Sequence, residues 1–161
     1  MNRDTLRHPE VVGRDDSATL LFGDALMTIK ARAGHGRPAL IEWISPAGGT
    51  APLHVHDDAD DTFYVIDGDL TLWCDGTTAQ ARPGDYVVLP AGVPHSILVG
   101  RDRPLRALVI HANNQFVDLV EAIGAPPDAP RDTQPFDPQA VAVAASRRGQ
   151  RVLGPSPFAA G

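Results

Sequence analysis

Short apolar runs, separated by turn residues, follow one another along the first two thirds of the chain. Gly and Pro, 15 of each, interrupt these runs at intervals of roughly 8 to 15 residues. Runs of this length, with alternating apolar and polar residues, are typical of strands that bury one face. The pattern therefore predicts an all-β sandwich or barrel. The expected strands cover residues 19–22, 25–31, 39–45, 52–56, 62–66, 70–74, 77–81, 85–89, 95–99 and 105–111.

Two Asp-Gly pairs lie between neighbouring runs. Asp67-Gly68 precedes the run 70–74, and Asp75-Gly76 follows it. Asp-Gly is favoured in two-residue hairpin turns because both central residues need a positive φ. Each pair therefore predicts a β-hairpin.

After residue 111 the spacing of apolar residues changes. They recur at i, i+3, i+4 and i+7 from Phe116 to Ile123, which predicts an amphipathic helix. Asn113 or Asn114 would cap its N-terminus, and Gly124 would end it.

A second short helix is expected beyond a Pro-rich connector over residues 125–135. Asp137 is a suitable N-cap and Pro138 a suitable first residue, since Pro has no N–H to lose there. Gly149 would end this helix. Residues 153–161 would then form a tail.

The length bounds the domain organisation. A chain of 161 residues fits one domain, at roughly 100 to 200 residues per domain. Within it we expect a polar N-terminal arm over residues 1–18, a β-barrel over 19–112, and a C-terminal helical segment and tail over 113–161.

The composition narrows the kinds of partner. With 14 basic and 20 acidic residues the formal net charge is −6, so the surface repels nucleic acid and anionic lipid. The first residues contain no apolar secretory stretch, and no apolar run is long enough to cross a membrane. We therefore expect a cytoplasmic protein that binds neither nucleic acid nor membrane.

Any metal site must be built from histidine and carboxylate side chains, because Cys74 is the single cysteine. His54 and His56 lie one residue apart in an expected strand, so both imidazoles leave the same face. Asp61 directly precedes the next expected strand, and the alternation of side chains places Asp61, Phe63 and Val65 on one side of the run 61–66. His95 begins a later strand, and closure into a barrel would bring it opposite the others.

These four side chains form a coherent donor set. Three neutral imidazoles and one carboxylate leave coordination positions open and suit a divalent ion, namely Fe, Mn, Ni, Co, Cu or Zn. The donors alone do not choose among these metals. We predict one divalent metal ion per chain, held by His54, His56, Asp61 and His95.

The same residues, with the glycines and prolines around them, resemble the two motifs of the cupin family. The first motif, G-x5-H-x-H-x(3,4)-E-x6-G, is filled in register by Gly48, His54, His56, Asp61 and Gly68. The second motif, G-x5-P-x-G-x2-H-x3-N, is filled by Gly84, Pro90, Gly92 and His95. The resemblance implies a double-stranded β-helix, or jelly-roll, barrel with one or two short C-terminal helices.

Two positions depart from the cupin motifs. Asp61 stands where the family usually has Glu, and Val99 stands where it usually has Asn. Because Asp is one methylene shorter, Asp61 could draw the metal toward it, leave the ligand set, or yield its role to Asp60. Val99 places an apolar side chain where the family usually has the polar side chain of Asn.

Further segments are similar to small single-domain cupins of the quercetin 2,3-dioxygenase-like group. They are the run 39–43, the turn 45–49, and the predicted helix with its Pro-rich sequel. In that group the metal binds a flavonol-type enol, the motif carboxylate can act as a base, and dioxygen is inserted. The resemblance implies a metal-dependent dioxygenase of a flavonol-like or polyketide-like enol, with Asp61 as ligand and catalytic base.

Two other functions fit the same residues, because a fold does not fix a function. One is a redox-neutral cyclase or isomerase in natural-product biosynthesis. The other is a small-molecule-binding cupin without turnover. Oxygen consumption would separate a dioxygenase from both.

A substrate pocket is expected beside the metal ligands. For its apolar members, Trp43, Phe63, Ile97 and Val99, the alternative role is to fill the interior of the barrel. For His111 the alternative is a packed or surface position. Because exposed sheet edges tend to be paired, we also expect a homodimer. The expected pocket residues are Trp43, Phe63, Ile97, Val99 and His111.

Overall fold

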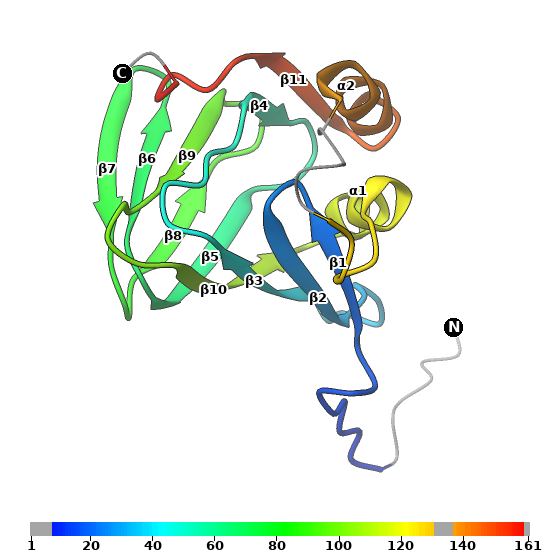
Figure 1. Ribbon diagram of the computed structural model, residues 1–161. Helices are drawn as coiled ribbons and strands as arrows, with labels where there is room; N and C mark the ends of the chain where they lie inside the picture. The colour runs from blue at the N-terminus through cyan, green and yellow to red at the C-terminus, as the bar shows by residue number, and fades with distance from the viewer. Residues whose placement is uncertain (1–7, 131–136, 160–161) are drawn as a thin grey trace.

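Two antiparallel sheets face each other in the computed structural model, which describes residues 8–130 and 137–159 (Figure 1). The first sheet has the spatial order β1 (Ala18–Phe22), β2 (Ala25–Ala31), β3 (Ala39–Ser45), β10 (Leu105–His111), β5 (Asp61–Asp67) and β8 (Tyr86–Leu89). The second has the order β11 (Gln150–Gly154), β4 (Leu53–His56), β9 (His95–Val99), β6 (Leu70–Cys74) and β7 (Thr77–Ala81). This is the two-sheet cupin fold, so the predicted fold class is confirmed.

The strands follow the predicted alternation closely. Each predicted strand is present, and its ends differ from the prediction by at most one residue. In β2 and β10 every second side chain is buried between the sheets. The inward side chains of both sheets form one core, in which the rings of Trp43 and Phe63 lie 5.6 Å apart between centroids.

One of the two predicted hairpins is confirmed. Asp75 and Gly76 join β6 to β7, with Cys74 paired to Thr77 and with φ of 45° and 81° at the two turn residues. These are the positive φ angles that a two-residue hairpin turn requires.

The hairpin predicted at Asp67-Gly68 is wrong. The turn connects β5 of the first sheet to β6 of the second, so the two strands do not pair with each other. Gly68 is still required there: its φ is +84°, and a Cβ at this position would lie 2.5 Å from the carbonyl oxygen of Pro104. The Asp-Gly pair marks a tight turn, but the alternation on either side does not reveal that the chain changes sheets.

Both predicted helices are present. The first, α1 (Gln115–Ile123), ends before Gly124 as expected. Of the two asparagines considered as its cap, Asn113 accepts a hydrogen bond from the backbone N–H of Gln115 at 3.0 Å, whereas the Asn114 side chain bonds to the backbone of Ala33. Asn114 is thus the N-cap residue by position, whereas the side chain that accepts from the first helical N–H is that of Asn113.

The second helix, α2 (Pro138–Ser146), starts as predicted, with Asp137 accepting a hydrogen bond from the backbone N–H of Gln139 at 3.0 Å. It ends before Gly149. With a φ of +68°, Gly149 instead turns the chain into β11.

The strand β11 was not predicted, and the expectation of a tail over 153–161 is wrong for its first residues. β11 pairs antiparallel with β4, matching Gln150 to His56 and Val152 to His54. Its five residues, QRVLG, carry too few apolar positions to show an alternation. The missed strand lies against the strand that carries two of the predicted metal ligands.

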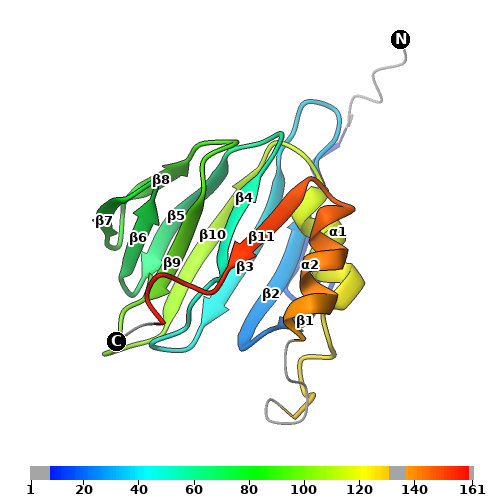
Figure 2. The ribbon, with the colours of Figure 1, turned by 90° about the horizontal axis from the view of Figure 1, so that it is seen from above.

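The two helices lie side by side at one end of the sheets, next to β1 and β11 (Figure 2). No helix among the described residues is long and apolar enough to cross a membrane. Residues 1–7 of the predicted arm, 131–135 of the predicted connector and 160–161 of the predicted tail lie outside the described residues.

Candidate metal and substrate site

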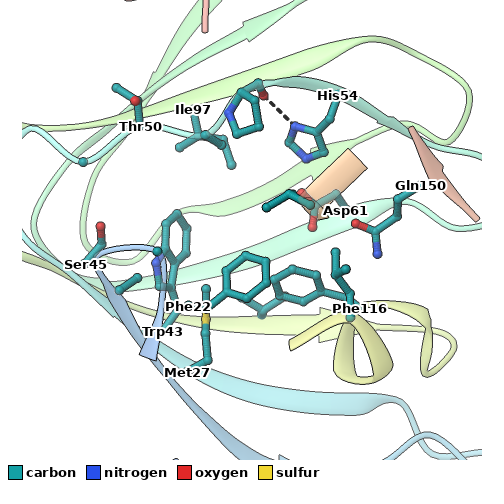
Figure 3. A pocket seen from close by; sticks show the side chains of 18 of the residues that line it. Phe22, Met27, Trp43, Ser45, Thr50, His54, Asp61, Ile97, Phe116 and Gln150 are labelled. Atoms are coloured by element: carbon teal, nitrogen blue, oxygen red, sulfur yellow. Dashed lines mark hydrogen bonds between the residues drawn. The ribbon is translucent and has the colours of Figure 1, made fainter. Parts of the chain in front are cut away.

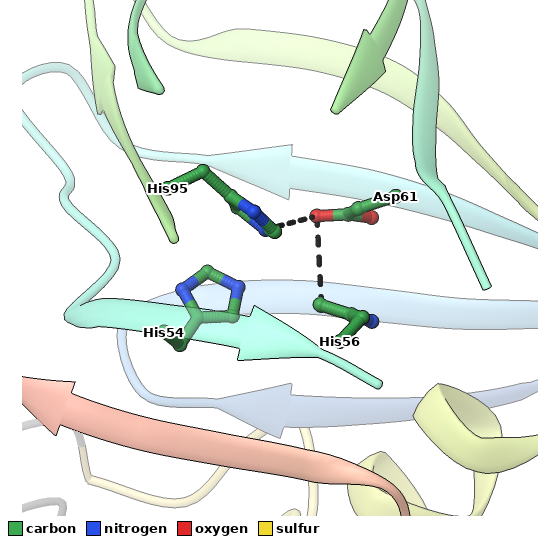
Figure 4. Close-up of side chains that lie close together, drawn as sticks. All are labelled: His54, His56, Asp61 and His95. Atoms are coloured by element: carbon green, nitrogen blue, oxygen red, sulfur yellow. Dashed lines mark ion pairs between the residues drawn. The ribbon is translucent and has the colours of Figure 1, made fainter. Parts of the chain in front are cut away.

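Three histidines of the second sheet meet on its inner side. His54 and His56 lie on β4, and His95, the first residue of β9, is the register partner of His54. The ring centroids of His54 and His95 are 4.4 Å apart, and those of His54 and His56 are 5.3 Å apart. Strand alternation and pairing thus bring three imidazoles to one place (Figure 4).

Asp61 reaches this group from the opposite sheet, where it begins β5. Its Oδ2 lies 3.5 Å from Nε2 of His95 and 3.7 Å from Nε2 of His56. Each of the four side chains offers one ligand atom, and these atoms all lie within 4.8 Å of one another. The structure therefore brings together the four residues predicted as ligands.

The separations also suit a shared ion despite the short aspartate. Two donors that are each about 2.1 Å from one ion lie at most about 4.2 Å apart. Both distances from Asp61 to the histidine nitrogens fall within this limit. Asp60, the alternative carboxylate, is exposed and accepts a hydrogen bond from the backbone N–H of Ala91 at 2.9 Å, so it faces away from the histidines.

Backbone carbonyl groups fix the orientation of two imidazoles. Nδ1 of His54 bonds to the carbonyl of Pro52 at 2.8 Å, and Nδ1 of His95 bonds to the carbonyl of Val93 at 2.9 Å. A carbonyl only accepts, so each Nδ1 carries the proton and each Nε2 carries a free lone pair.

Nε2 of His95 is buried and has no hydrogen-bond partner within the described residues. A buried acceptor without a donor destabilises the fold by about 1–3 kcal/mol. A cation held by this nitrogen would remove that cost. The donor set, the ring orientations and the orphaned nitrogen therefore fit a divalent metal.

Burial sets the charge of the site. It lowers the pKa of His56 to about 4 and lowers the pKa of His54 as well. Burial is the largest single influence on Asp61 and would raise its pKa, but the neighbouring histidines, with His111 foremost, together hold the pKa well below its usual value. At neutral pH the site thus presents neutral His54 and His56 and an ionised Asp61, as metal binding requires.

His111 lies behind Asp61, on β10. Its Nε2 donates a hydrogen bond to Oδ1 of Asp61 at 2.6 Å. It is buried, and it is not among the described residues that line the cavity. The structure therefore places His111 as a support for Asp61, away from the pocket wall where we expected it.

A cavity of about 530 Å³ opens beside the cluster and is lined by His54, His56 and Asp61 at one end (Figure 3). This volume lies within the roughly 300–1,000 Å³ of small-molecule sites. Trp43, Phe63 and Ile97, three of the expected pocket residues, lie on its wall. Val99, like His111, is buried but is not among the described lining residues.

Several lining residues were not foreseen from the sequence. Phe22 and Met27 lie on strands whose inward face was predictable, although their proximity to the site was not. Phe116 was assigned to the apolar face of a helix, and it packs edge-on against Phe22 with centroids 5.8 Å apart. Gln150 was missed because β11 was missed.

Known proteins resemble this chain in both sequence and fold. Residues 41–111 match the cupin domain family. Quercetin 2,3-dioxygenase from Bacillus subtilis (strain 168) is 32% identical over 123 residues, which cover 74% of this chain and 36% of that protein. The chain thus spans about a third of the length of this relative.

Solved structures extend the likeness to the fold. The polyketide cyclase RemF from Streptomyces resistomycificus is 25% identical, with a TM-score of 0.54 over 65% of this chain and 79% of that one. KdgF from Halomonas sp., at 15% identity, has a TM-score of 0.57 over 68% of this chain and 99% of that one. With the family match and the fold in agreement, residues 41–111 of this chain form a cupin domain, and the chain has the two-sheet cupin fold.

Proposed function

We propose that this cupin is a metal-dependent dioxygenase of an enol-containing aromatic molecule of the flavonol or polyketide type. One observation carries the proposal: the His/Asp cluster opens into a cavity whose wall is mostly apolar and aromatic. A site for a small polar metabolite would need more polar groups on that wall. The dioxygenase activity is supported by the relative of that name at 32% identity.

His54, His56, Asp61 and His95 would hold one divalent ion of Fe, Mn, Ni, Co, Cu or Zn. When bound, such an ion supplies a Lewis acid for an enol oxygen and, where it is redox-active, a route to dioxygen chemistry. The residues of the chain do the remaining work of binding the aromatic body and positioning a base.

Asp61 is the candidate base of the reaction. His111 occupies Oδ1, so Oδ2 faces the cluster and is the oxygen available to take a proton. Because its pKa is held below the usual value, Asp61 stays ionised at neutral pH but is a weak base. It is therefore suited to an acidic enol, such as one conjugated to an aromatic ring and a carbonyl group.

Elemental analysis together with oxygen uptake tests the proposal. The protein as purified should hold close to one metal ion per chain and should consume dioxygen when a flavonol such as quercetin is added. His56→Ala should lose both properties because it removes one of the four donors. Asp60→Asn, the matched control, changes the neighbouring carboxylate outside the cluster and should keep both.

Metal-free protein that still converts the flavonol would contradict the metal-dependent reaction. Metal-loaded protein that binds flavonols but never converts them would favour a binding role. In that case His54→Ala should leave the affinity for the aromatic unchanged.

A redox-neutral cyclase or isomerase is the second candidate. It is favoured by the likeness to the polyketide cyclase RemF, which extends over 79% of that chain at 25% identity. Conversion of a polyketide-like enol without oxygen uptake, in a protein that holds zinc, would support this function over the dioxygenase.

A further inference from the structure

Two buried hydrogen-bond donors on the cavity wall have no partner among the residues that the structure describes. They are the indole Nε1 of Trp43 and the amide Nε2 of Gln150. Trp43 is 9% exposed and Gln150 is 3% exposed, and both line the cavity. A buried N–H that loses water without gaining an acceptor destabilises the protein. Two such donors on residues that line the same cavity indicate acceptors supplied from within it.

The two donors lie at different ends of the cavity. Gln150 is paired with His56 across β11 and β4, and it lies on the same side of the view as Asp61 in Figure 3. Trp43 lies on β3, at the other side of the same view. Aromatic side chains lie between them, and Phe63 packs against the indole with centroids 5.6 Å apart. The cavity is thus an aromatic-walled space with a donor at each end.

We propose that Trp43 and Gln150 determine substrate specificity by binding acceptor oxygens at opposite ends of an elongated aromatic molecule. Gln150 donates to an oxygen at the reacting end, and Trp43 donates to an oxygen at the far end. A carboxylate beside Gln150 would be repelled by the ionised Asp61, so the near acceptor is an uncharged oxygen, and we assign this role to the hydroxyl oxygen of the enol. This inference rests on the proposed function, because it describes the substrate of the same site.

Binding of three flavones to the purified protein tests this inference without relying on turnover. 3,4′-Dihydroxyflavone has a hydroxyl at both ends, 3-hydroxyflavone lacks the far hydroxyl, and 4′-hydroxyflavone lacks the near one. We expect the wild type to bind the first about tenfold more tightly than either of the others. Fluorescence or calorimetric titration gives each dissociation constant.

Two variants separate the two donors. Trp43→Phe keeps an aromatic ring but removes the N–H, so it should bind 3,4′-dihydroxyflavone and 3-hydroxyflavone equally. Gln150→Leu retains the Trp43 donor, so it should still bind 3,4′-dihydroxyflavone more tightly than 3-hydroxyflavone. EDTA treatment removes the metal, so that in the wild type Gln150 remains as the near donor. The EDTA-treated Gln150→Leu variant lacks this donor too and should no longer distinguish 3,4′-dihydroxyflavone from 4′-hydroxyflavone.

Tyr86→Phe is the matched control, because it also removes a hydrogen-bond donor from an aromatic side chain, at an exposed residue that does not line the cavity, and it should keep the wild-type preferences. Circular dichroism confirms that each variant is folded. An undiminished preference for the far hydroxyl in Trp43→Phe would overturn the inference, and so would a wild type that binds none of the flavones. Oxygen uptake without these preferences would also overturn it and leave the proposed dioxygenase standing. The preferences without oxygen uptake would support the inference and contradict the dioxygenase.

Discussion

The two carboxylate oxygens of Asp61 have different neighbours. Oδ1 accepts a hydrogen bond from His111 at 2.6 Å, and Oδ2 lies 3.5 Å from Nε2 of His95. A carboxylate free to rotate would present either oxygen to a metal, whereas this one presents Oδ2. His111 therefore orients a side chain that is one methylene shorter than the glutamate usual at this position.

Removal of the His111 imidazole should weaken metal binding. In His111→Leu, Oδ1 of Asp61 loses its donor and the carboxylate its orientation. We expect the affinity of the apoprotein for Zn²⁺ or Co²⁺ to fall by about 10- to 100-fold. In His111→Gln the amide can still donate to Asp61, so it should recover most of the affinity. Titration against a competing chelator measures both variants, and wild-type affinity in His111→Leu would show that Asp61 needs no support.

At the residue scale, the four residues of the candidate metal site could be predicted, whereas the pocket could be predicted only in part. Strand alternation determines which face His54 and His56 share, and the cupin motifs relate them to His95. Alternation also predicts that Val99 and His111 point inward. It cannot tell whether an inward side chain meets the cavity or the packed core, because that depends on side chains from the opposite sheet.

At the scale of the elements, β11 supports the strand that carries two of the candidate ligands. The pairing of β4 with β9 is limited to His54 and His95, whereas its pairing with β11 runs along the whole of β4. The backbone N–H of Asp57 also donates to the carbonyl of Gly149 at 2.8 Å, next to this pairing. The C-terminal strand thus stabilises β4 from the side opposite β9.

Strands with four to seven residues and clear alternation could be predicted, but β11 could not. Its residues show no apolar period, and it follows a helix and a glycine that suggest an end to regular structure. The wrong hairpin at Asp67-Gly68 has a similar origin. Local sequence encodes a tight turn, but sheet membership depends on pairing with strands far away in the chain.

Two turn glycines with similar backbone angles should respond differently to substitution by alanine. Gly68 and Gly76 have φ of +84° and +81°, so alanine adds backbone strain of roughly 1–2 kcal/mol at either position. At Gly68 the new Cβ would also lie 2.5 Å from the carbonyl oxygen of Pro104, whereas at Gly76 no described atom lies within 4 Å. Urea unfolding should therefore show a larger loss for Gly68→Ala than for Gly76→Ala. Equal losses of unfolding free energy would show that the backbone around Pro104 moves away from the new Cβ without loss of stability.

At the scale of the whole molecule, the site forms only when the two sheets close on each other. The histidines come from the second sheet and Asp61 from the first. The helix α1 adds Phe116, whose ring lies 5.4 Å from that of His111 between centroids. The same closure removes water from His54 and His56, so it lowers the pKa values of these two imidazoles and links the stability of the fold to pH.

Without metal, the protein should lose stability as the pH falls below about 6.5. The pKa of His56 is about 4 in the folded chain and about 6.5 when the side chain is free, so between these values the unfolded chain binds a proton that the folded chain does not. The free energy of unfolding then decreases with falling pH, by about 3 kcal/mol at pH 4 from this residue. The lowered pKa of His54 acts in the same direction.

The measurement is urea unfolding in EDTA at a series of pH values from 7.5 to 4.5. His56→Gln should unfold with a shallower dependence on pH, since glutamine has no proton to bind. His35→Gln alters an exposed histidine that is not a member of the cluster and should keep the wild-type slope. Added metal should steepen the slope, because protons compete with the ion for the same nitrogen atoms. Equal stability of the metal-free wild type at pH 7.5 and pH 5 would mean that folding does not keep these imidazoles neutral.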